Sequence, residues 1–239
     1  MTVLVTRPKR DSLAFAAILR SRGVESLIAP LLTIVDITIT LGDLDGVQGC
    51  VVTSANGADA LARATADRCV PVLAVGTASA ARAREHGFTG VHAAGGNLES
   101  LAALIRQNLE PASGRLIHVS GSRIAGDLPG LLARDGFVVE RVVGYHADAA
   151  SGLPQAALAA LRGGDLLGVA HFSPRTADIF MRLVRKAGAD TFLQSLVGFC
   201  LSDAVARNLE GSDWKDLVVA PRSDAESLAE CIVLAGEHS

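Results

Sequence analysis

The sequence predicts an α/β fold with parallel strands in two sheets. One unit recurs along the chain: a short β-branched run, a turn of small polar residues, and an Ala/Leu-rich helical pattern. This alternation is typical of parallel strands joined by right-handed helical crossovers. About ten such strands are more than one sheet of an ordinary domain holds, so two sheets are expected. Apolar residues make up 49% of the chain but aromatics only 4%, which favours a core of Ala, Val, Leu and Ile.

The first half of the chain alternates strands and helices in a regular order. Gly23 is expected to end the first helix, since glycine readily adopts the left-handed conformation found there. Strands are expected at residues 3–5, 25–30, 50–52, 72–75 and 91–93, with helices at 12–22, after 57, up to 87 and at 98–109.

The second half repeats this pattern. Strands are expected at 116–119, 138–145, 169–172, 197–201 and 217–220, with helices up to 135, at 155–161, up to 188, up to 209 and from 224. Two extended segments, Leu31 to Thr40 and Val142 to Ala149, outrun ordinary strands. Their alternation fits ribbons that bridge two lobes, and it fits ordinary edge strands equally well.

Composition excludes several classes of protein. A formal net charge of −3 argues against a general nucleic-acid binder, although local arginines and amides can still bind an anion. No apolar run has the length of a membrane span, and the chain opens without a basic-then-apolar leader. Cys50, Cys69, Cys200 and Cys231 form no CxxC pair. We therefore expect a reduced, cytoplasmic protein in which Cys50, Cys200 and Cys231 are buried.

Small hydroxyl residues follow many of the expected strands, where ligands of parallel sheets usually bind. Each alone is explained as a helix cap, but together the helix N-termini would attract carboxylates. The residues of this surface are Thr6, Ser54, Ser79, Ser120, Ser173 and Ser202. Arginines at strand ends could grip a carboxylate or lie solvated on the surface, namely Arg7, Arg123, Arg175 and Arg222.

Familiar catalytic and metal motifs are missing. The sequence contains no GxGxxG, P-loop or GxSxG pattern, and its six histidines show no ligand spacing. His118 and His171 are expected to be packed or hydrogen-bonded core residues. Tyr145, the single tyrosine, could serve as a packed hinge residue or as a hydrogen-bond donor.

Several short motifs, taken in order, resemble the uroporphyrinogen-III synthase family over nearly the whole chain. They are VLVTRP at 3–8, APLLTI at 29–34, VVTSANG at 51–57, AVGTASA at 74–80, AGDLPGLLARDGFVVERVVGYHA at 125–147, HFSPRTA at 171–177 and CLSDAVA at 200–206. The resemblance implies two Rossmann/flavodoxin-like lobes joined by a two-stranded β-ladder, with the substrate in the cleft between them. Carried over, lobe one is 1–32 plus 150–239, lobe two is 40–141, and the ladder is 33–39 with 142–149.

The resemblance also implies an activity. Such an enzyme is a hydro-lyase of haem biosynthesis that cyclises hydroxymethylbilane with inversion of the last pyrrole ring and loss of water. It uses no metal or organic cofactor, and its partner is this linear tetrapyrrole polycarboxylate, with no nucleic acid and no membrane. A monomer is expected. The alternative is a cytoplasmic two-lobed ligand-binding or sensor module without catalysis.

Motif matching and strand-end position together predict the site. Tyr145 matches the family's ladder tyrosine and is the candidate donor to the departing hydroxyl. Ser79 stands where a threonine is common, and Val205 replaces a threonine near Ser202, so a polar contact there must come from Ser202 or a backbone amide. The predicted substrate-binding residues are Arg7, Ser54, Ser79, Ser120, Gly121, Ser173, Arg175 and Ser202.

Overall fold

The computed structural model describes residues 2–124 and 126–237 and divides into two compact units. Unit 1 contains Met1–Thr33 and Asp148–Ser239, and unit 2 contains Ile34–Ala147. The predicted motif at 125–147 begins at Ala125, and predicted lobe one includes Met1, His238 and Ser239; these four residues lie outside the described ones. No helix in the described part of the chain is long and apolar enough to cross a membrane.

Unit 1 is built on a five-stranded sheet in the order β11-β10-β9-β1-β2, in which every neighbouring pair is parallel. Its strands are β1 (Thr2–Val5), β2 (Glu25–Ile28), β9 (Leu166–His171), β10 (Val197–Cys200) and β11 (Asp216–Val219). Its helices are α1 (Lys9–Ser21), α6 (Gln155–Gly163), α7 (Pro174–Lys186), α8 (Asp203–Ala206) and α9 (Ala225–Glu237), with a 3₁₀ helix at Asp190–Ser195.

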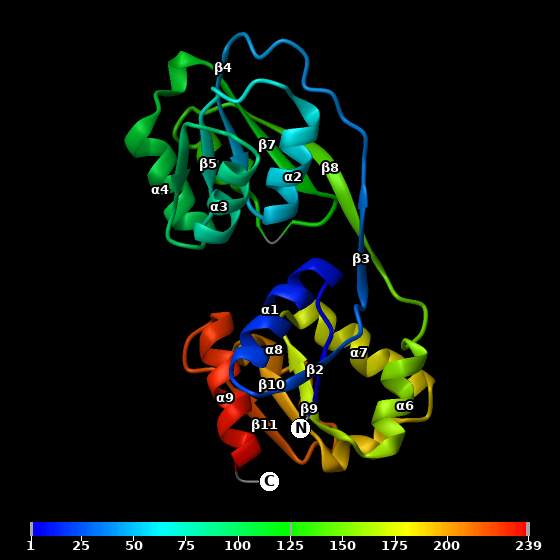
Figure 1. The fold of residues 1–239 in the computed structure, drawn as a ribbon. Coiled ribbons are helices and arrows are strands. Elements are labelled where there is room, and N and C mark those ends of the chain that lie inside the picture. Colours follow the sequence, from blue (N-terminus) through cyan, green and yellow to red (C-terminus); the bar gives the residue numbers. More distant parts are fainter. Residues whose placement is uncertain (1, 125, 238–239) are drawn as a thin grey trace. The chain divides into compact units, whose positions relative to one another are not determined.

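Unit 2 holds a six-stranded sheet in the order β3-β8-β7-β4-β5-β6 (Figure 1). Its strands are β3 (Leu32–Asp36), β4 (Val47–Val52), β5 (Val72–Ala74), β6 (Val91–Ala93), β7 (Arg115–Gly121) and β8 (Val139–Ala149). Its helices are α2 (Ala55–Ala64), α3 (Thr77–Glu85), α4 (Leu98–Asn108) and α5 (Leu128–Ala133), with a 3₁₀ helix at Pro111–Ser113. The predicted class, α/β with parallel sheets, is confirmed.

Strands β3 and β8 form the predicted two-stranded ladder. Ile37 N donates to Gly144 O and Ala150 N donates to Leu31 O, both at 3.0 Å. Residue numbers rise along one strand as they fall along the other, so the two strands are antiparallel. The chain passes from one unit to the other along these same segments, because the unit boundaries fall at Thr33/Ile34 and Ala147/Asp148. Strand β3 is the edge of the six-stranded sheet, whereas β8 lies between β3 and β7, so the edge-strand interpretation is right for the first segment and wrong for the second.

Alternation along the strands explains why helices cover both faces of the unit 2 sheet. Cys50 and Val52 pack with Leu61 of α2, whereas Val51, between them, packs with Leu101 and other residues of α4. Successive side chains of a strand point to opposite faces, so a wholly apolar strand requires cover on both sides. In unit 1, α1 and α9 pack together in one apolar cluster, and α6 and α7 contact β9.

Two helix predictions need correction. Helix α1 begins at Lys9 rather than Ser12, because Pro8 precedes it with φ −49°, a value suited to a helix start. Helix α8 ends at Ala206 rather than near Leu209. Asn208 and Leu209 donate to carbonyls three residues back, so the α-helical turn tightens into a 3₁₀-type turn.

The cysteine prediction also holds only in part. Cys50 and Cys200 are buried, and burial raises the pKa of each thiol to about 12. Cys231, on α9, is only partly buried, and Cys69 is exposed.

Candidate active site

Unit 2 contains a cavity with both polar and apolar lining residues at the carboxyl ends of β4 and β7. Parallel strands bring their carboxyl ends to one edge of the sheet, so turns far apart in sequence meet there. The cavity has a volume of about 200 Å³. It is lined by Thr53, Ser54, Leu98, His118, Gly121, Arg123, Ile124, Gly126 and Tyr145. The structure therefore brings together three of the predicted site residues, Ser54, Gly121 and Tyr145.

The hydroxyls of Ser54 and Tyr145 form a hydrogen bond of 2.8 Å in this cavity. Ser54 is also the N-cap of α2, where its side chain accepts a bond of 3.0 Å from Gly57 N. A serine hydroxyl can donate once and accept twice, so both bonds coexist. The cap therefore fixes Ser54 at the start of α2, and Ser54 in turn fixes the phenol.

Gly121 lets the Tyr145 ring lie against the backbone of β7. A Cβ at Gly121 would lie 2.8 Å from two ring carbons of Tyr145 and 3.1 Å from its hydroxyl oxygen. The pairing of β7 with β8 shifts here, from Ser120 opposite Val143 to Gly121 opposite Tyr145. This irregularity leaves Gly144 as an extra residue on β8, a β-bulge that redirects the next side chain.

His118 lies on β7 beside this cavity and is 1% exposed. Its Nε2 is 3.2 Å from Thr53 Oγ1, and its Nδ1 has no hydrogen-bond partner among residues 2–124 and 126–237. Burial lowers the pKa of His118 to about 4, and the nearby charge of Arg141 contributes to this shift. The imidazole is therefore neutral at neutral pH, as a hydrogen-bonded core residue would be.

Arg123 supplies a positive charge at the rim of the cavity. Its side chain is exposed and has no ion-pair partner within the described part of the chain. Next to it, Ile124 is 42% exposed, which is unusual for a large apolar side chain. The rim thus offers one cation and one apolar contact to a ligand.

Four predicted site residues lie in unit 1, after strand ends that are neighbours in its sheet. Arg7 follows β1; its guanidinium lies 4.3 Å above the Phe172 ring and 3.5 Å from an Asp11 carboxylate oxygen. Burial lowers the pKa of Arg7, and Asp11 partly offsets this. Ser173 caps α7 by accepting from Thr176 N at 3.2 Å.

The other two unit 1 residues lie at helix starts. Arg175 is in the first turn of α7, directly after the Ser173 cap. Ser202 precedes α8, but its hydroxyl makes no capping bond. The cap interpretation is therefore wrong for Ser202, because the amide of Val205 donates to the Ser202 carbonyl oxygen at 2.9 Å and not to its hydroxyl.

Two further predicted residues of unit 2 lie apart from the cavity lining. Ser79 is 4% exposed within α3, whose N-cap is Gly76, so Ser79 is not a cap. Ser120 is 1% exposed on β7; its hydroxyl accepts from Arg141 Nε at 2.9 Å and donates to Gly121 O at 3.2 Å. Any role of these two residues in substrate binding remains a prediction.

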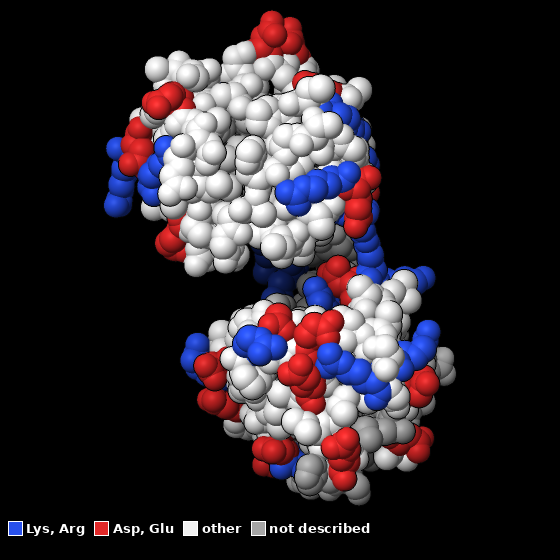
Figure 2. All heavy atoms as spheres, turned by 60° about the vertical axis from the view of Figure 1, so that its left-hand side comes forward, with Lys and Arg blue, Asp and Glu red and all other residues white. Residues whose placement is uncertain are grey.

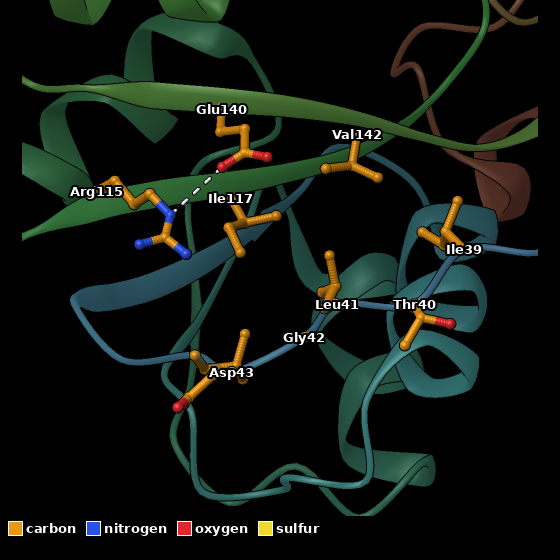
Figure 3. A pocket seen from close by; sticks show the side chains of 10 residues that line it. Ile39, Thr40, Leu41, Gly42, Asp43, Arg115, Ile117, Glu140 and Val142 are labelled. Atoms are coloured by element: carbon orange, nitrogen blue, oxygen red, sulfur yellow. Dashed lines mark ion pairs between the residues drawn. The ribbon is translucent and has the colours of Figure 1, made fainter.

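A second hollow in unit 2 lies near the opposite end of β7 (Figure 3). It has a volume of about 320 Å³ and a lining that includes the apolar residues Ile117 and Val142. Arg115, at its rim, forms a 3.3 Å ion pair with Glu140 and donates to Asp45 O. Because this cation is already paired, the hollow is less suited to a carboxylate than the cavity at Tyr145.

Charged residues are distributed without a dominant sign on the face drawn in Figure 2. Acidic and basic side chains alternate over unit 1, and much of unit 2 on this face is uncharged. This face therefore offers an anion no broad basic surface, so anion binding there would depend on local groups.

Sequence reasoning chose neither Thr53 nor His118 for the site, and it left Arg123 evenly balanced. Thr53 directly precedes Ser54, and His118 is a polar residue within the apolar strand LIHV, so both carried a weak signal. The sequence gives no local signal for Arg141, because its contacts reach the end of a neighbouring strand.

A family model and solved structures both match the chain, and they name the same enzyme. The family model described as HEM4, uroporphyrinogen-III synthase HemD, matches residues 14–230. The solved uroporphyrinogen-III synthetase of Helicobacter pylori 26695 is 15% identical with a TM-score of 0.67, over 98% of this chain and 99% of that one. A mutant uroporphyrinogen III synthase from the extreme thermophile Thermus thermophilus is 18% identical with a TM-score of 0.55, over 100% of both chains. No curated protein matches the chain.

Proposed function

Since the chain belongs to the uroporphyrinogen-III synthase family, we propose that it cyclises hydroxymethylbilane with inversion of the last pyrrole ring and loss of water. This makes it a cofactor-independent hydro-lyase of haem biosynthesis, acting in the cytoplasm as a monomer. The observation that carries the proposal is the 2.8 Å pair of Ser54 and Tyr145 hydroxyls in a cavity at strand ends.

The departing hydroxyl of the substrate needs a hydrogen-bond donor. The Tyr145 phenol can donate to this oxygen as its bond to carbon breaks, so that the oxygen leaves as water after receiving a proton. Ser54 holds the phenol in place and is itself held by the start of α2. Tyr145 is thus the proposed catalytic residue.

Selectivity for the inverted product depends more on control of the substrate's conformation than on activation of its reacting groups. Once the hydroxyl has left, the activated chain closes readily without inversion, so the enzyme must hold a bent chain in which one closure is favoured. Arg123 and the amides at the start of α2 are suited to hold carboxylates of this chain near Tyr145. In unit 1, Arg7, Ser173, Arg175 and Ser202 remain the predicted substrate-binding residues.

An isomer assay tests the proposal. Purified protein is mixed with freshly prepared hydroxymethylbilane, and the oxidised products are separated by chromatography. Type III product is expected in excess over type I, whereas the same mixture without protein should give type I. Type I alone in both mixtures would reject the proposed activity, and tight binding without turnover would instead favour a ligand-binding or sensor module.

A further inference from the structure

We propose that Arg141 is a positioning residue that fastens the carboxyl end of β7 beneath the Tyr145 ring. Its effect on turnover rests on the proposed function, because Tyr145 is the proposed catalytic residue. Its effect on the geometry of Tyr145 does not depend on that function and can be measured separately.

Arg141 bonds to three consecutive residues of the neighbouring strand and its turn. From β8, its Nε donates to Ser120 Oγ at 2.9 Å, and its Nη2 donates to Gly121 O at 2.7 Å and to Ser122 O at 3.0 Å. A planar guanidinium can serve all three acceptors at once, whereas the compact ammonium of lysine cannot reproduce this fork. One side chain thus holds the strand end together.

Two of these three residues, Gly121 and Ser122, contact Tyr145 directly. The ring lies against Gly121, where a Cβ would approach to 2.8 Å, and Ser122 N donates to Tyr145 O at 2.9 Å. The phenol then reaches Ser54 at 2.8 Å. If residues 120–122 move, the backbone and ring of Tyr145 lose their supports on this side, and the bond to Ser54 is strained.

This assignment also explains why Ser120 is buried with its hydroxyl engaged. The Ser120 hydroxyl accepts a hydrogen bond from Arg141 Nε, so Ser120, near the end of β7, helps to hold the Arg141 side chain in place. The charge of Arg141 further acts on His118, whose pKa it helps to lower. Arg141 is therefore connected to Ser120, beside the cavity, and to His118 and Gly121, which line it.

Fluorine NMR can test the geometric part directly. Because Tyr145 is the only tyrosine in the chain, 3-fluorotyrosine incorporated during expression reports on this position alone. Arg141→Met is expected to shift or split the single resonance, and Ser120→Ala, which removes one of the three acceptors, is expected to shift it less. The matched control is Arg115→Met, which removes an arginine from the opposite end of β7. A resonance that is unchanged in Arg141→Met, or equally changed in the control, would overturn the proposal.

Turnover provides a second and independent readout. Arg141→Met is expected to lower kcat for the type III product by roughly 10- to 100-fold, with a much smaller change in KM, since a small misplacement of a catalytic group has effects of this size. In a Tyr145→Phe background, Arg141→Met should lower kcat little further, because the hydroxyl that Arg141 positions is already absent. Fully additive losses would show that Arg141 acts elsewhere and would reject the proposal.

Two outcomes keep this test separate from that of the proposed function. If the unmodified protein forms no type III product, the proposed function fails, and the fluorine spectra still decide the role of Arg141. If Arg141→Met does not fold, the Arg141→Lys variant replaces it. That variant keeps the charge but loses the fork, so it should move the resonance in the same direction and recover only part of the turnover. A Lys variant with the native resonance and full turnover would contradict the proposal.

Discussion

Single hydroxyl groups decide most of the chemistry proposed for this cavity. Ser54 accepts a helix amide and contacts the Tyr145 phenol at the same time, so one residue serves both the fold and the site. Tyr145, in contrast, contributes its ring to packing and its hydroxyl to the cavity. Because the two residues combine structural and site roles in different ways, we expect different effects of substitution at the two positions.

For Tyr145→Phe we expect a large loss of turnover with a small loss of stability. The ring stays in place, but the donor to the departing hydroxyl is removed, and general acid catalysis typically contributes roughly 100-fold or more. Loss of the bond to Ser54 should lower the free energy of unfolding by about 1 kcal/mol. Steady-state kinetics and urea unfolding of the same preparation measure both effects. Unchanged turnover would remove Tyr145 from the mechanism.

Ser54→Ala is expected to lower both stability and turnover. It removes the N-cap of α2, which should cost about 1 kcal/mol, and it also leaves the phenol without its partner. Asn97→Ala is a matched control, because Asn97 caps α4 in the same unit by accepting from Ser100 N. Urea unfolding should show a loss of about 1 kcal/mol for Asn97→Ala and a larger loss for Ser54→Ala, which also loses the bond to Tyr145, while only Ser54→Ala should reduce kcat. An equal loss of turnover in the control would assign the effect to stability alone.

At the scale of secondary-structure elements, the irregular pairing of β7 with β8 places the phenol. The strands run in regular parallel register from Leu116 to Ser120, and the extra residue then turns Tyr145 onto Gly121. Regular pairing to the end would have brought Gly121 opposite Gly144 and moved the tyrosine one position along. A one-residue change in register moves side chains to the other face, so the bulge determines which face presents the phenol.

Gly121→Ala tests this arrangement. The new methyl group would lie 2.8 Å from the Tyr145 ring carbons, so the ring must move, at a cost of roughly 1–3 kcal/mol typical of overpacking. We expect a lower melting temperature and a loss of turnover comparable with that of Tyr145→Phe. In the control Gly42→Ala, the added Cβ meets no atom within 4 Å, so both properties should stay near those of the unmodified protein. Full activity in Gly121→Ala would show that turnover does not depend on the position of the Tyr145 ring.

At the scale of the whole molecule, each unit buries one histidine in its sheet within residues 2–124 and 126–237, and this makes stability dependent on pH. His171 is fully buried beside Phe180 and Trp214 in unit 1, and burial lowers its pKa from 6.5 to about 3. Neither of its ring nitrogens has a hydrogen-bond partner among the described residues. As pH falls below 6.5, the unfolded chain therefore binds a proton that the folded chain excludes.

The expected result is a free energy of unfolding that decreases as pH falls from about 6.5 towards 3, by up to about 1.4 kcal/mol per pH unit for this group. His171→Leu should flatten this dependence, because an apolar residue binds no proton in either state. Urea unfolding of both proteins at pH 7 and pH 5 measures the difference. The same loss of stability in both proteins would show that other groups, carboxylates included, dominate the acid sensitivity.

The sequence by itself determined the α/β class, the order of strands and helices, and the hydroxyl residues at strand ends. These features follow from local periodicity and from turn residues, which act over a few neighbouring positions. Helix ends were less well predicted, as α1 and α8 show, because a proline or a tightened turn can move them by several residues.

Only the tertiary structure decided which of these residues meet. Ser54 and Tyr145 are separated by 91 positions, and their contact depends on the sheet order, the bulge before Tyr145 and the anchoring of β7 by Arg141. Strand-end position suggested equal roles for Ser120 and Ser54, yet one hydroxyl is used inside the protein and the other lines the cavity. The physical reason is that local sequence specifies an element and its faces, whereas register and long-range hydrogen bonds determine which side chains share a site.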